Sequence, residues 1–333
     1  TGPNLILTEN TGQYFLSGII KTMPMRKIKD ITVLMAVYND AEYVSGAVRS
    51  ILNQTHRDFE FVIINDGSDD NDRTEEIILS FKDPRINYKK ILHKGLAGAL
   101  NVGLEISSYD YIARLDADDL NTADRLQRQI AFLNSDKGSD TDILASRSVY
   151  FDSRNRILFL HKPPSTDLAI KKFLNLHNPL NHSSVIFRKG LIMSAGGYDE
   201  NFGSYEDFEL WFRIKDKVTF HICKDVLVYN RLRPGSIMDK SNPDSIYRLL
   251  FDNAVINLES STSSADKKYW NNILFWVEYF YGSKIRARKY YRDDITFRKS
   301  LAYINTFLPE DEFRKLKDKR FRLRISGGVN IDN

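Results

Sequence analysis

The sequence predicts an α/β fold with a mostly parallel sheet flanked by helices, followed by a C-terminal helical extension. Between residues 31 and 134, short apolar runs alternate with stretches of helical periodicity, which is typical of a parallel sheet with helices on both faces. After Pro243 the chain becomes helical, aromatic and basic. A length of 333 residues suits one large domain with a smaller appendage.

The first half of the large domain repeats a strand-helix unit. Its predicted strands cover 31–37, 59–65, 86–90 and 111–115, and its predicted helices cover 42–53, 72–81, 96–106 and 123–134. Sheets of this kind bind ligands beyond the carboxyl ends of their strands. Asn39, Asp66 and Asp116 follow three of these strands directly, so we expect them at the ligand-binding edge.

The second half has a less regular pattern. Its predicted strands cover 143–151, 157–160 and 184–187, and its predicted helices cover 168–174 and 208–215. We therefore divide the chain into an N-terminal extension (1–30), a large domain (31–240, with halves 31–140 and 141–240) and a basic helical extension (241–333). Residues 1–30 show no clear periodicity, and their role is not predicted.

Composition excludes several classes of protein. Apolar residues make up 42% and charged residues 28%, as in a folded globular protein. A net charge of +4 is too small to predict nucleic acid as a partner. Cys223 is the sole cysteine, which suits a reducing compartment, and we expect a cytoplasmic location. No apolar run reaches the roughly 18 residues of a membrane span.

The basic charge is concentrated near the C-terminus. From Lys284 to Arg324 there are 14 Lys or Arg residues against 6 Asp or Glu residues, interleaved with aromatic residues. Such a surface suits peripheral contact with the inner face of a cell membrane, where each basic residue contributes about 1 kcal/mol. The alternatives are a solvated helical face whose aromatics pack on the large domain, or a homodimer contact.

The segment Asp116-Ala117-Asp118 is the most informative chemical feature. Two carboxylates one residue apart at the end of a strand suit a hard cation such as Mn²⁺ or Mg²⁺, with coordination positions left for phosphate oxygens. The structural alternative is that Asp116 to Asp119 cap the following helix.

Three further segments carry polar residues in informative places. Asn65 to Asp70 follow a strand and include Gly67, where the backbone is able to approach a ligand closely, although the same residues also form good turns. The small residues between Lys94 and Gly103 suit close approach to a ligand or a neighbouring helix. The acidic pair Glu206-Asp207 precedes a predicted short helix and suits a general base.

For the acidic pair there is a structural alternative as well. Ser204 and Asp207 have the spacing of a capping box, in which Asp207 would bond the backbone at the helix start.

Taken in order, these segments resemble the family-2 glycosyltransferases, whose fold is the Rossmann-like GT-A fold. The resemblance covers residues 31–240 and rests on six motifs. The family includes many bacterial enzymes of polysaccharide and glycoconjugate synthesis. The motifs are Val37-Tyr-Asn-Asp40, Asn65-Asp-Gly-Ser68, Leu115-Asp-Ala-Asp-Asp119, His182-Ser-Ser-Val-Ile-Phe-Arg188, Gly196-Gly-Tyr-Asp199 and Glu206-Asp207.

The resemblance implies a role for each matching residue. Asp118 and Asp116 would hold the metal, Asp207 with Glu206 would form the catalytic acidic pair, and His182 and Trp211 would lie on the acceptor side. The residues implied in nucleotide binding are Ala36, Val37, Tyr38, Asn39, Asp66, Gly67, Lys94, Gly95, Asp116 and Ala117. The resemblance further implies inverting transfer from a nucleotide sugar, most commonly a UDP-sugar, to a glycan or lipid-linked acceptor.

One departure from the family pattern concerns Arg233. Many relatives carry a metal-binding histidine at the matching place, whereas this chain has Arg231-Leu-Arg233. Arginine does not ligate cations, but it binds phosphate bidentately. We therefore predict that Arg233 approaches the diphosphate, with a solvated loop arginine as the alternative.

His182 and Trp211 also have structural interpretations. A lone histidine is more often a satisfied structural group than a ligand-binding one, and Trp211 has the spacing of a core residue.

Other functions fit the sequence less well. A nucleotide-binding oxidoreductase would carry a Gly-x-Gly-x-x-Gly turn after the first strand, and a sugar-nucleotide pyrophosphorylase would carry a glycine-rich basic loop there. The chain has Tyr38-Asn39-Asp40 at this place. The remaining alternative is a catalytically silent relative that binds nucleotide sugars or glycans.

Overall fold

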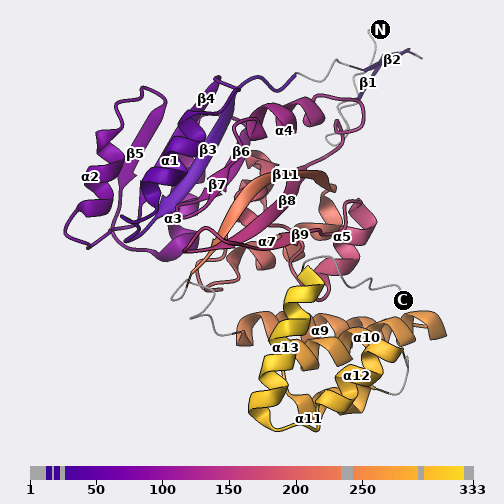
Figure 1. Ribbon diagram of the computed structural model, residues 1–333. Helices are drawn as coiled ribbons and strands as arrows, with labels where there is room; N and C mark the ends of the chain where they lie inside the picture. Colours follow the sequence, from indigo (N-terminus) through magenta and orange to yellow (C-terminus); the bar gives the residue numbers. More distant parts are fainter. Residues whose placement is uncertain (1–12, 17–18, 23–26, 234–242, 292–295, 326–333) are drawn as a thin grey trace.

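The computed structural model describes residues 13–16, 19–22, 27–233, 243–291 and 296–325. Its centre is a nine-stranded sheet in the order β5-β4-β3-β6-β10-β8-β11-β7, with β9 paired to β8 (Figure 1). The strands are β3 (Ile31–Val37), β4 (Phe59–Asn65), β5 (Ile86–Lys90), β6 (Tyr111–Asp116), β7 (Leu120–Asn121), β8 (Ile143–Asp152), β9 (Ile157–His161), β10 (Ile186–Arg188) and β11 (Phe220–Leu232).

The first four strands of this sheet are parallel, as the sequence predicts. β3 pairs with β4 and β6, and β4 pairs with β5, all in parallel register. The carboxyl ends of β3, β4 and β6 therefore meet at one edge. Residues Asn39, Asp66 and Asp116 lie at that edge because each follows or ends one of these strands.

Helices cover both faces of the parallel part. The helices of the first half are α1 (Val44–Leu52), α2 (Arg73–Ser80), α3 (Gly95–Ile106) and α4 (Arg125–Leu133). Alternate residues of β3 point to opposite faces: Leu34 packs with α3, whereas Val33 and Met35 pack with α1 and α4. Both faces of β3 are buried, which explains why its side chains are mostly apolar on both faces.

The second half of the sheet is mixed. β10 runs antiparallel between β6 and β8, β8 and β11 are parallel, and β7 and β9 pair antiparallel at the margins. The remaining elements of this half are α5 (Asp167–Leu174), η1 (His182–Ser184), α6 (Lys189–Ser194), α7 (Glu206–Ile214) and η2 (Lys215–Lys217). This half of the sheet therefore contains antiparallel pairs, whereas the first half is entirely parallel.

Two boundaries differ from the sequence prediction in ways that affect the site. The predicted strand 184–187 is a 3₁₀ turn, η1, followed by β10, and the predicted helix 208–215 begins already at Glu206. Glu206 and Asp207 therefore occupy the first turn of α7 rather than preceding it. Carboxylates are favoured there because the helix N-terminus carries partial positive charge.

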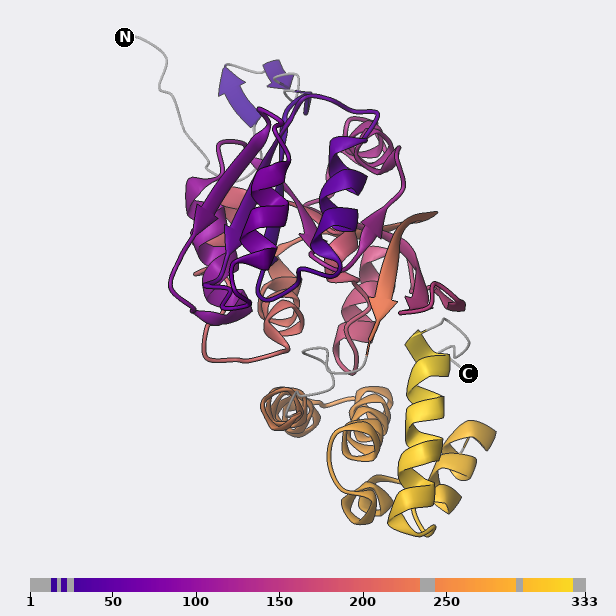
Figure 2. The same ribbon diagram turned by 60° about the vertical axis from the view of Figure 1, so that its left-hand side comes forward.

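The C-terminal extension is a helical body that lies at the opposite end of the molecule from the N-terminal strands (Figures 1 and 2). Its elements are α9 (Asp244–Ser260), α10 (Ser264–Phe280), α11 (Lys284–Ala287), η3 (Arg288–Tyr290), α12 (Phe297–Asn305) and α13 (Glu310–Ile325). Its apolar residues continue the core that covers one face of the sheet. The contact is closest where His177, just after α5, bonds Tyr281 Oη at 2.8 Å.

Several aromatic residues of this extension pack against one another. Phe313 is buried, and the rings of Tyr291 and Tyr303 stack at 3.9 Å. Phe307, by contrast, is exposed, and the side chains of Phe297 and Phe321 lie outside the described residues. Among the helices that the structure describes, none has the length and apolar composition of a bilayer span.

The N-terminal segment contains a short hairpin that the sequence pattern does not predict. β1 (Gln13–Leu16) and β2 (Ile19–Thr22) pair antiparallel as a separate sheet.

Candidate active site

The acidic segment predicted as a metal site begins at the end of β6. Asp116 is the last residue of the strand, and Asp118 follows with 17% of its side chain exposed. Arg114, two residues earlier on the same face of β6, is fully buried and pairs with the Asp116 carboxylate at 2.5 Å. The buried guanidinium offsets the negative charge at the point where the strand opens.

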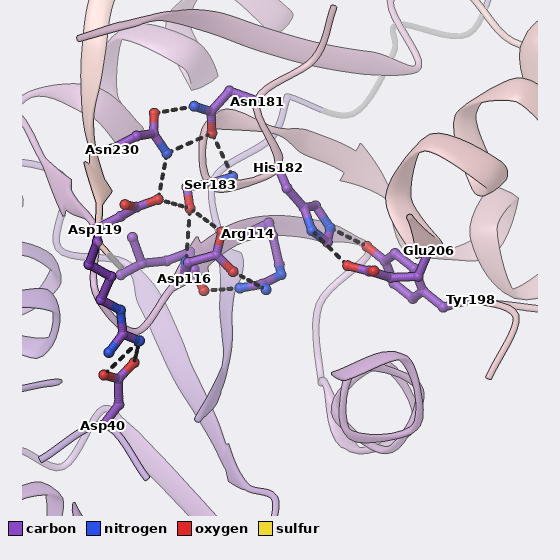
Figure 3. A network of polar contacts seen from close by, with 12 residues as sticks. Asp40, Arg114, Asp116, Asp119, Asn181, His182, Ser183, Tyr198, Glu206 and Asn230 are labelled. Atoms are coloured by element: carbon purple, nitrogen blue, oxygen red, sulfur yellow. Dashed lines mark hydrogen bonds and ion pairs between the residues drawn. The ribbon is translucent and has the colours of Figure 1, made fainter. Parts of the chain in front are cut away.

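A hydrogen-bond network joins this acidic loop to the second half of the domain (Figure 3). Ser183 Oγ lies 2.8 Å from Asp116 Oδ2 and 2.5 Å from Asp119 Oδ2. Asn230 Nδ2, on β11, donates to Asp119 at 2.5 Å, and the amides of Asn181 and Asn230 bond each other. Three distant chain segments are thereby held around one buried carboxyl group.

The proton count in this network indicates that one of the two carboxyl groups bonded to Ser183 carries a proton. The Ser183 hydroxyl carries one proton, so two hydrogen bonds to two carboxyl groups require a second proton. Burial, followed by the charges of Asp118 and Asp116, raises the pKa of Asp119 well above its usual range. The geometry and the direction of the pKa shift therefore agree.

Two arginines at the end of β11 contact the acidic loop. Arg231 donates from its backbone to Asp119 and from Nε to the Asp118 carbonyl, and its guanidinium lies between the rings of Tyr43 and Phe151. Arg233 pairs with the Asp118 carboxylate at 2.9 Å and with Asp40 at 2.9 Å. The carboxylate predicted to hold a metal is thus paired with an arginine in this structure.

Asp66 is a positioning residue for the loop before α3. It is buried, and its carboxylate accepts the backbone N–H groups of Lys94 and Gly95 at 2.7 and 2.9 Å. His93 Nδ1 lies 2.9 Å from the same carboxylate. Gly67 has φ +70°, and a Cβ there would lie 2.8 Å from the backbone nitrogen of His93. Both Asp66 and Gly67 therefore set the path of residues 93–95.

The end of β3 offers an exposed aromatic and an exposed amide. Tyr38 lies against His93 with ring centroids 4.4 Å apart, and Asn39, at φ 52°, bonds Asp69. Ala36 and Val37 are buried, and the Val37 carbonyl accepts the Asp66 N–H at 2.9 Å.

The two carboxylates of the acidic pair on α7 differ in their exposure to solvent. Glu206 is buried and faces His182, whose Nδ1 lies 3.8 Å from Glu206 Oε1 and whose Nε2 bonds Tyr198 Oη at 2.9 Å (Figure 3). Asp207 is partly exposed, and its carboxylate accepts from Asn178 Nδ2 at 2.8 Å. Asp207 is therefore the member of the pair that an acceptor is able to reach.

Burial also separates the protonation states of these groups. It raises the pKa of Glu206 to about 8, with the charge of Asp207 adding to the effect, and raises the pKa of Asp207 to about 6. It lowers the pKa of His182 to about 3, with Arg114 contributing. At neutral pH, Asp207 is therefore the ionised member of the pair, while Glu206 is largely protonated and His182 is neutral.

The structure corrects the prediction for Trp211. Its ring is fully buried, 6.0 Å from the ring of Phe187 and edge-on to His182. An acceptor contact is therefore wrong for Trp211, and the core alternative is right. The indole sits on the inner face of α7, where the apolar spacing of the helix places it.

The capping alternatives have different outcomes. α7 begins after Tyr205 without a side-chain cap, so Ser204 and Asp207 do not form a capping box, although Asp207 Oδ1 accepts the backbone N–H of Phe208 at 2.6 Å in the first turn. Asp124, and none of Asp116 to Asp119, is the residue before α4. Asp70, by contrast, accepts from the backbone of Thr74 and does support the start of α2.

Several site residues were not predicted from the sequence. Arg114 had a local signal, because strand periodicity places it on the same face as Asp116. Asp40 and Ser183 belong to two of the six motifs, but no role was predicted for either. Asn181 and Asn230 had no local signal, since their contacts depend on how β10 and β11 join the sheet.

Comparison with known proteins identifies relatives over most of the chain. Residues 32–192 match the model of glycosyl transferase family 2. An uncharacterized glycosyltransferase of Methanocaldococcus jannaschii, MJ1057, is 32% identical over 262 residues, which cover 75% of this chain and 85% of that protein. WbnJ of Escherichia coli, an O-antigen biosynthesis glycosyltransferase, is 32% identical over 58% of this chain and 74% of its own length.

Some relatives are much longer than the matched region. The chain spans 34% of an uncharacterized glycosyltransferase of Rickettsia conorii, at 28% identity over 60% of this chain.

Solved structures show the same fold at low sequence identity. Residues 1–349 of Staphylococcus aureus TarS in complex with UDP-GlcNAc align with a TM-score of 0.57 and 18% identity, covering 85% of this chain and 82% of that one. The mannosyltransferase PcManGT of Pyrobaculum calidifontis, in complex with GDP-Man and Mn²⁺, aligns with a TM-score of 0.55 and 13% identity, covering 91% and 87%. The GT-A fold, the family model and the identity to MJ1057 agree, and the chain is therefore a glycosyltransferase of family 2.

Proposed function

We propose that this glycosyltransferase transfers a sugar from a nucleoside-diphosphate donor to a hydroxyl of a glycan or lipid-linked acceptor, with inversion at the anomeric carbon. One observation carries the proposal: the carboxylates of Asp116 and Asp118 end a strand at the ligand-binding edge, while the partly exposed Asp207 projects from α7. Burial raises the pKa of Asp207, and the charge of Asp116 adds to the effect. The two carboxylates therefore interact electrostatically.

The donor in this proposal is a UDP-sugar. A UDP-GlcNAc complex of TarS and a GDP-Man complex of PcManGT support a nucleotide sugar in general, and the first supports uridine. The base and ribose would lie along the end of β3, at Ala36 to Asn39, and beside the loop that Asp66 holds. In this role Asp66 and Gly67 position Lys94 and Gly95, and Ala117 offers its backbone next to Asp116.

Mn²⁺ or Mg²⁺ fits the oxygen donors of Asp118 and Asp116. Two carboxylates plus donor phosphates are a usual ligand set for these ions. Among the described residues, no cluster of three or more His, Cys, Asp or Glu side chains is arranged to hold a metal, so phosphate oxygens would complete the coordination. A bound divalent cation stabilises the charge that develops on the departing nucleoside diphosphate. The Mn²⁺ in the PcManGT complex supports the same choice.

Asp207 is the general base in this proposal. Two N–H donors, from Asn178 and from the Phe208 backbone, orient its carboxylate at 2.8 and 2.6 Å. Above a pH of about 6 it is ionised and ready to accept the acceptor hydroxyl proton. Attack from the side opposite the leaving group, in one displacement, inverts the anomeric carbon. Glu206 stays inside the protein beside His182, and in this proposal His182 lies on the acceptor side of the site.

Arg233 is the proposed diphosphate clamp. Its guanidinium is already at the acidic loop, 2.9 Å from Asp118, and a planar fork of donors matches phosphate oxygens.

A donor panel tests the proposed function. Purified protein is incubated with UDP-, GDP-, dTDP- and CMP-sugars, with Mn²⁺ or with EDTA, and release of the nucleotide is measured. We expect release from a UDP-sugar that depends on Mn²⁺ and falls at least about 10²-fold in Asp118→Asn and Asp207→Asn. A wild-type protein that binds UDP but releases none with any acceptor mixture is the silent relative, and the proposal is then wrong.

The C-terminal body is proposed as a peripheral membrane contact. Ile304 and Phe307, both 59% exposed, and Ile285, 63% exposed, are apolar side chains on the surface of this body, and the guanidinium of Arg288 lies 3.8 Å from the centroid of the Phe307 ring. We propose residues 31–240 as the catalytic domain and residues 241–333 as the extension that brings it to an anionic lipid surface. Co-sedimentation with phosphatidylglycerol vesicles should fall when Ile304 and Phe307 are both changed to Glu. Equal sedimentation of the wild type and this variant contradicts the contact.

A further inference from the structure

Arg233 forms ion pairs with two acidic segments that are far apart in the sequence. Its Nε lies 2.9 Å from Asp118 Oδ2, and its terminal nitrogen lies 2.9 Å from the Asp40 carboxylate. Asp40 follows β3 and has only 8% of its side chain exposed. The ring of Tyr43 lies 4.9 Å below the guanidinium. One planar cation thus bridges the ends of β3 and β6.

A second arginine, Arg231, stabilises the segment that carries Arg233. Arg231 is fixed between Tyr43 and Phe151 and donates from Nε to the Asp118 carbonyl at 3.1 Å. Its backbone N–H is bound by Asp119 at 2.8 Å. The end of β11 is therefore anchored, and it delivers Arg233 to Asp118 in a defined direction.

The pairing with Arg233 competes with a metal at Asp118. A divalent cation bound to Asp118 Oδ2 would lie within a few ångströms of the guanidinium, and the two positive charges would repel each other strongly at that distance. Arg233 and the metal therefore exclude each other at this carboxylate oxygen. A diphosphate removes the conflict, because it brings negative charge that accepts a guanidinium fork.

We propose that Arg233 is a latch on the metal site: it occupies Asp118 when no donor is bound, and it moves to the diphosphate when donor and metal bind together. The inference rests on the proposed function and adds a coupling to it. The metal alone binds weakly because it must displace Arg233. The nucleotide strengthens metal binding because it gives Arg233 another partner.

Titration of Mn²⁺, followed by the loss of its free electron-paramagnetic-resonance signal, tests the latch with the full-length chain. Wild type, Arg233→Met and Arg233→Lys are titrated with Mn²⁺ alone and with saturating UDP. Without UDP, we expect Mn²⁺ to bind about tenfold more tightly to Arg233→Met than to wild type. UDP should strengthen Mn²⁺ binding by about 30-fold in wild type and by about threefold in Arg233→Met, within the range of ordinary couplings between sites.

Arg233→Lys separates the latch from a simple charge effect. Lysine keeps the positive charge but does not form a rigid fork between two carboxylates. The latch predicts an Mn²⁺ affinity without UDP between those of wild type and Arg233→Met. If Arg233→Lys matches wild type with and without UDP, charge alone explains the data and the latch is wrong. Unchanged or weaker Mn²⁺ binding in Arg233→Met overturns it as well.

Failure of the latch and failure of the proposed function give different results. Failure of the function appears as a wild-type protein without Mn²⁺-dependent nucleotide release. Failure of the latch appears in the order of Mn²⁺ affinities while wild-type turnover is intact. Thermal unfolding of each variant, compared with wild type, identifies any loss of fold, and Arg233→Lys provides the test if Arg233→Met is unstable.

Discussion

At the scale of single residues, Glu206 and Asp207 show how neighbouring carboxylates acquire different chemistry. Glu206 points into the protein toward His182, whereas Asp207 is partly exposed and is held by Asn178. Burial raises both pKa values, to about 8 for Glu206 and to about 6 for Asp207. A base needs an accessible, ionised carboxylate, and only Asp207 combines the two properties at neutral pH.

The first prediction concerns Asp207. Asp207→Asn keeps the shape and removes the base, so kcat should fall about 10²- to 10⁴-fold with donor affinity changed little. In wild type, kcat/KM should fall about tenfold per pH unit below a pH of about 6, because Asp207 becomes protonated there. Initial rates from pH 4.5 to 8 measure both. A flat profile through pH 6 contradicts the assignment.

The second prediction concerns stability and Glu206. Its pKa is raised from 4.5 in the unfolded chain to about 8 in the fold, so the folded state binds the extra proton between these values and stability falls as pH rises through that window. Glu206→Gln mimics the protonated group and should remove this fall, which is on the order of 3 kcal/mol by pH 8.

Urea unfolding of wild type and Glu206→Gln at pH 5, 6, 7 and 8 makes the comparison. The two proteins should be nearly equal at pH 5 and diverge above it, with the glutamine variant more stable. Parallel curves across the range would mean that Glu206 is ionised in the fold.

At the scale of secondary-structure elements, the sequence predictions are accurate where an element depends on local sequence and fail where it depends on pairing with distant strands. The bounds of β3, β4 and β5 are as predicted, because their apolar runs are short, buried and bounded by turn residues. β11 was not predicted: its 13 residues include Lys224, Asp225 and Asn230 and show no clean alternation. Its pairing with β8 and β7 is what makes it a strand.

The same distinction applies to the site. The sequence singles out Asp116, Asp118 and Asp207 because each belongs to a local motif next to a strand or helix. The contact of Arg233 with Asp118 was not predicted, and the sequence indicated the diphosphate as its partner. This contact arises because the end of β11 lies near the end of β6, although the two residues are 115 positions apart in the sequence.

The third prediction tests the link between β11 and the acidic loop. Asn230→Leu leaves a buried carboxyl oxygen of Asp119 and the amide of Asn181 without this partner, which should cost about 1–3 kcal/mol of unfolding free energy. Because Arg233 would be delivered less firmly, the affinity for UDP should also fall.

A matched control is Asn155→Gly. Asn155 contacts Arg231 from an exposed turn at φ 60°, where glycine is unstrained. Its unfolding free energy should change by less than about 0.5 kcal/mol. Equal stability of Asn230→Leu and wild type would show that the network does not hold β11.

At the scale of the whole molecule, the C-terminal helices share a core with the catalytic domain. Tyr281 bonds His177, Tyr269 bonds Asn175, and the rings of His177 and Phe280 meet edge-on at 4.9 Å. These contacts continue a buried apolar cluster from α5 and α7 into α10. The extension is therefore part of the fold of the enzyme and holds the second half of the large domain in place.

The fourth prediction follows from this shared core. A chain ending at residue 243 exposes the apolar surface beneath α9 and α10, so it should unfold at a lower temperature and bind the dye ANS. Tyr281→Phe, which removes one hydroxyl, should cost only about 1 kcal/mol. A truncated chain with the wild-type unfolding temperature would show that the C-terminal body is an independent domain.

A crystal structure of the protein with UDP and Mn²⁺ tests the proposed site most directly. We predict Mn²⁺ bound to Asp118 and the diphosphate, with oxygen ligands at about 2.0–2.2 Å, and Asp207 facing the open side where the sugar would lie. Diphosphate and Mn²⁺ bound away from Asp116 and Asp118, or Asp207 turned from the sugar position, would contradict it.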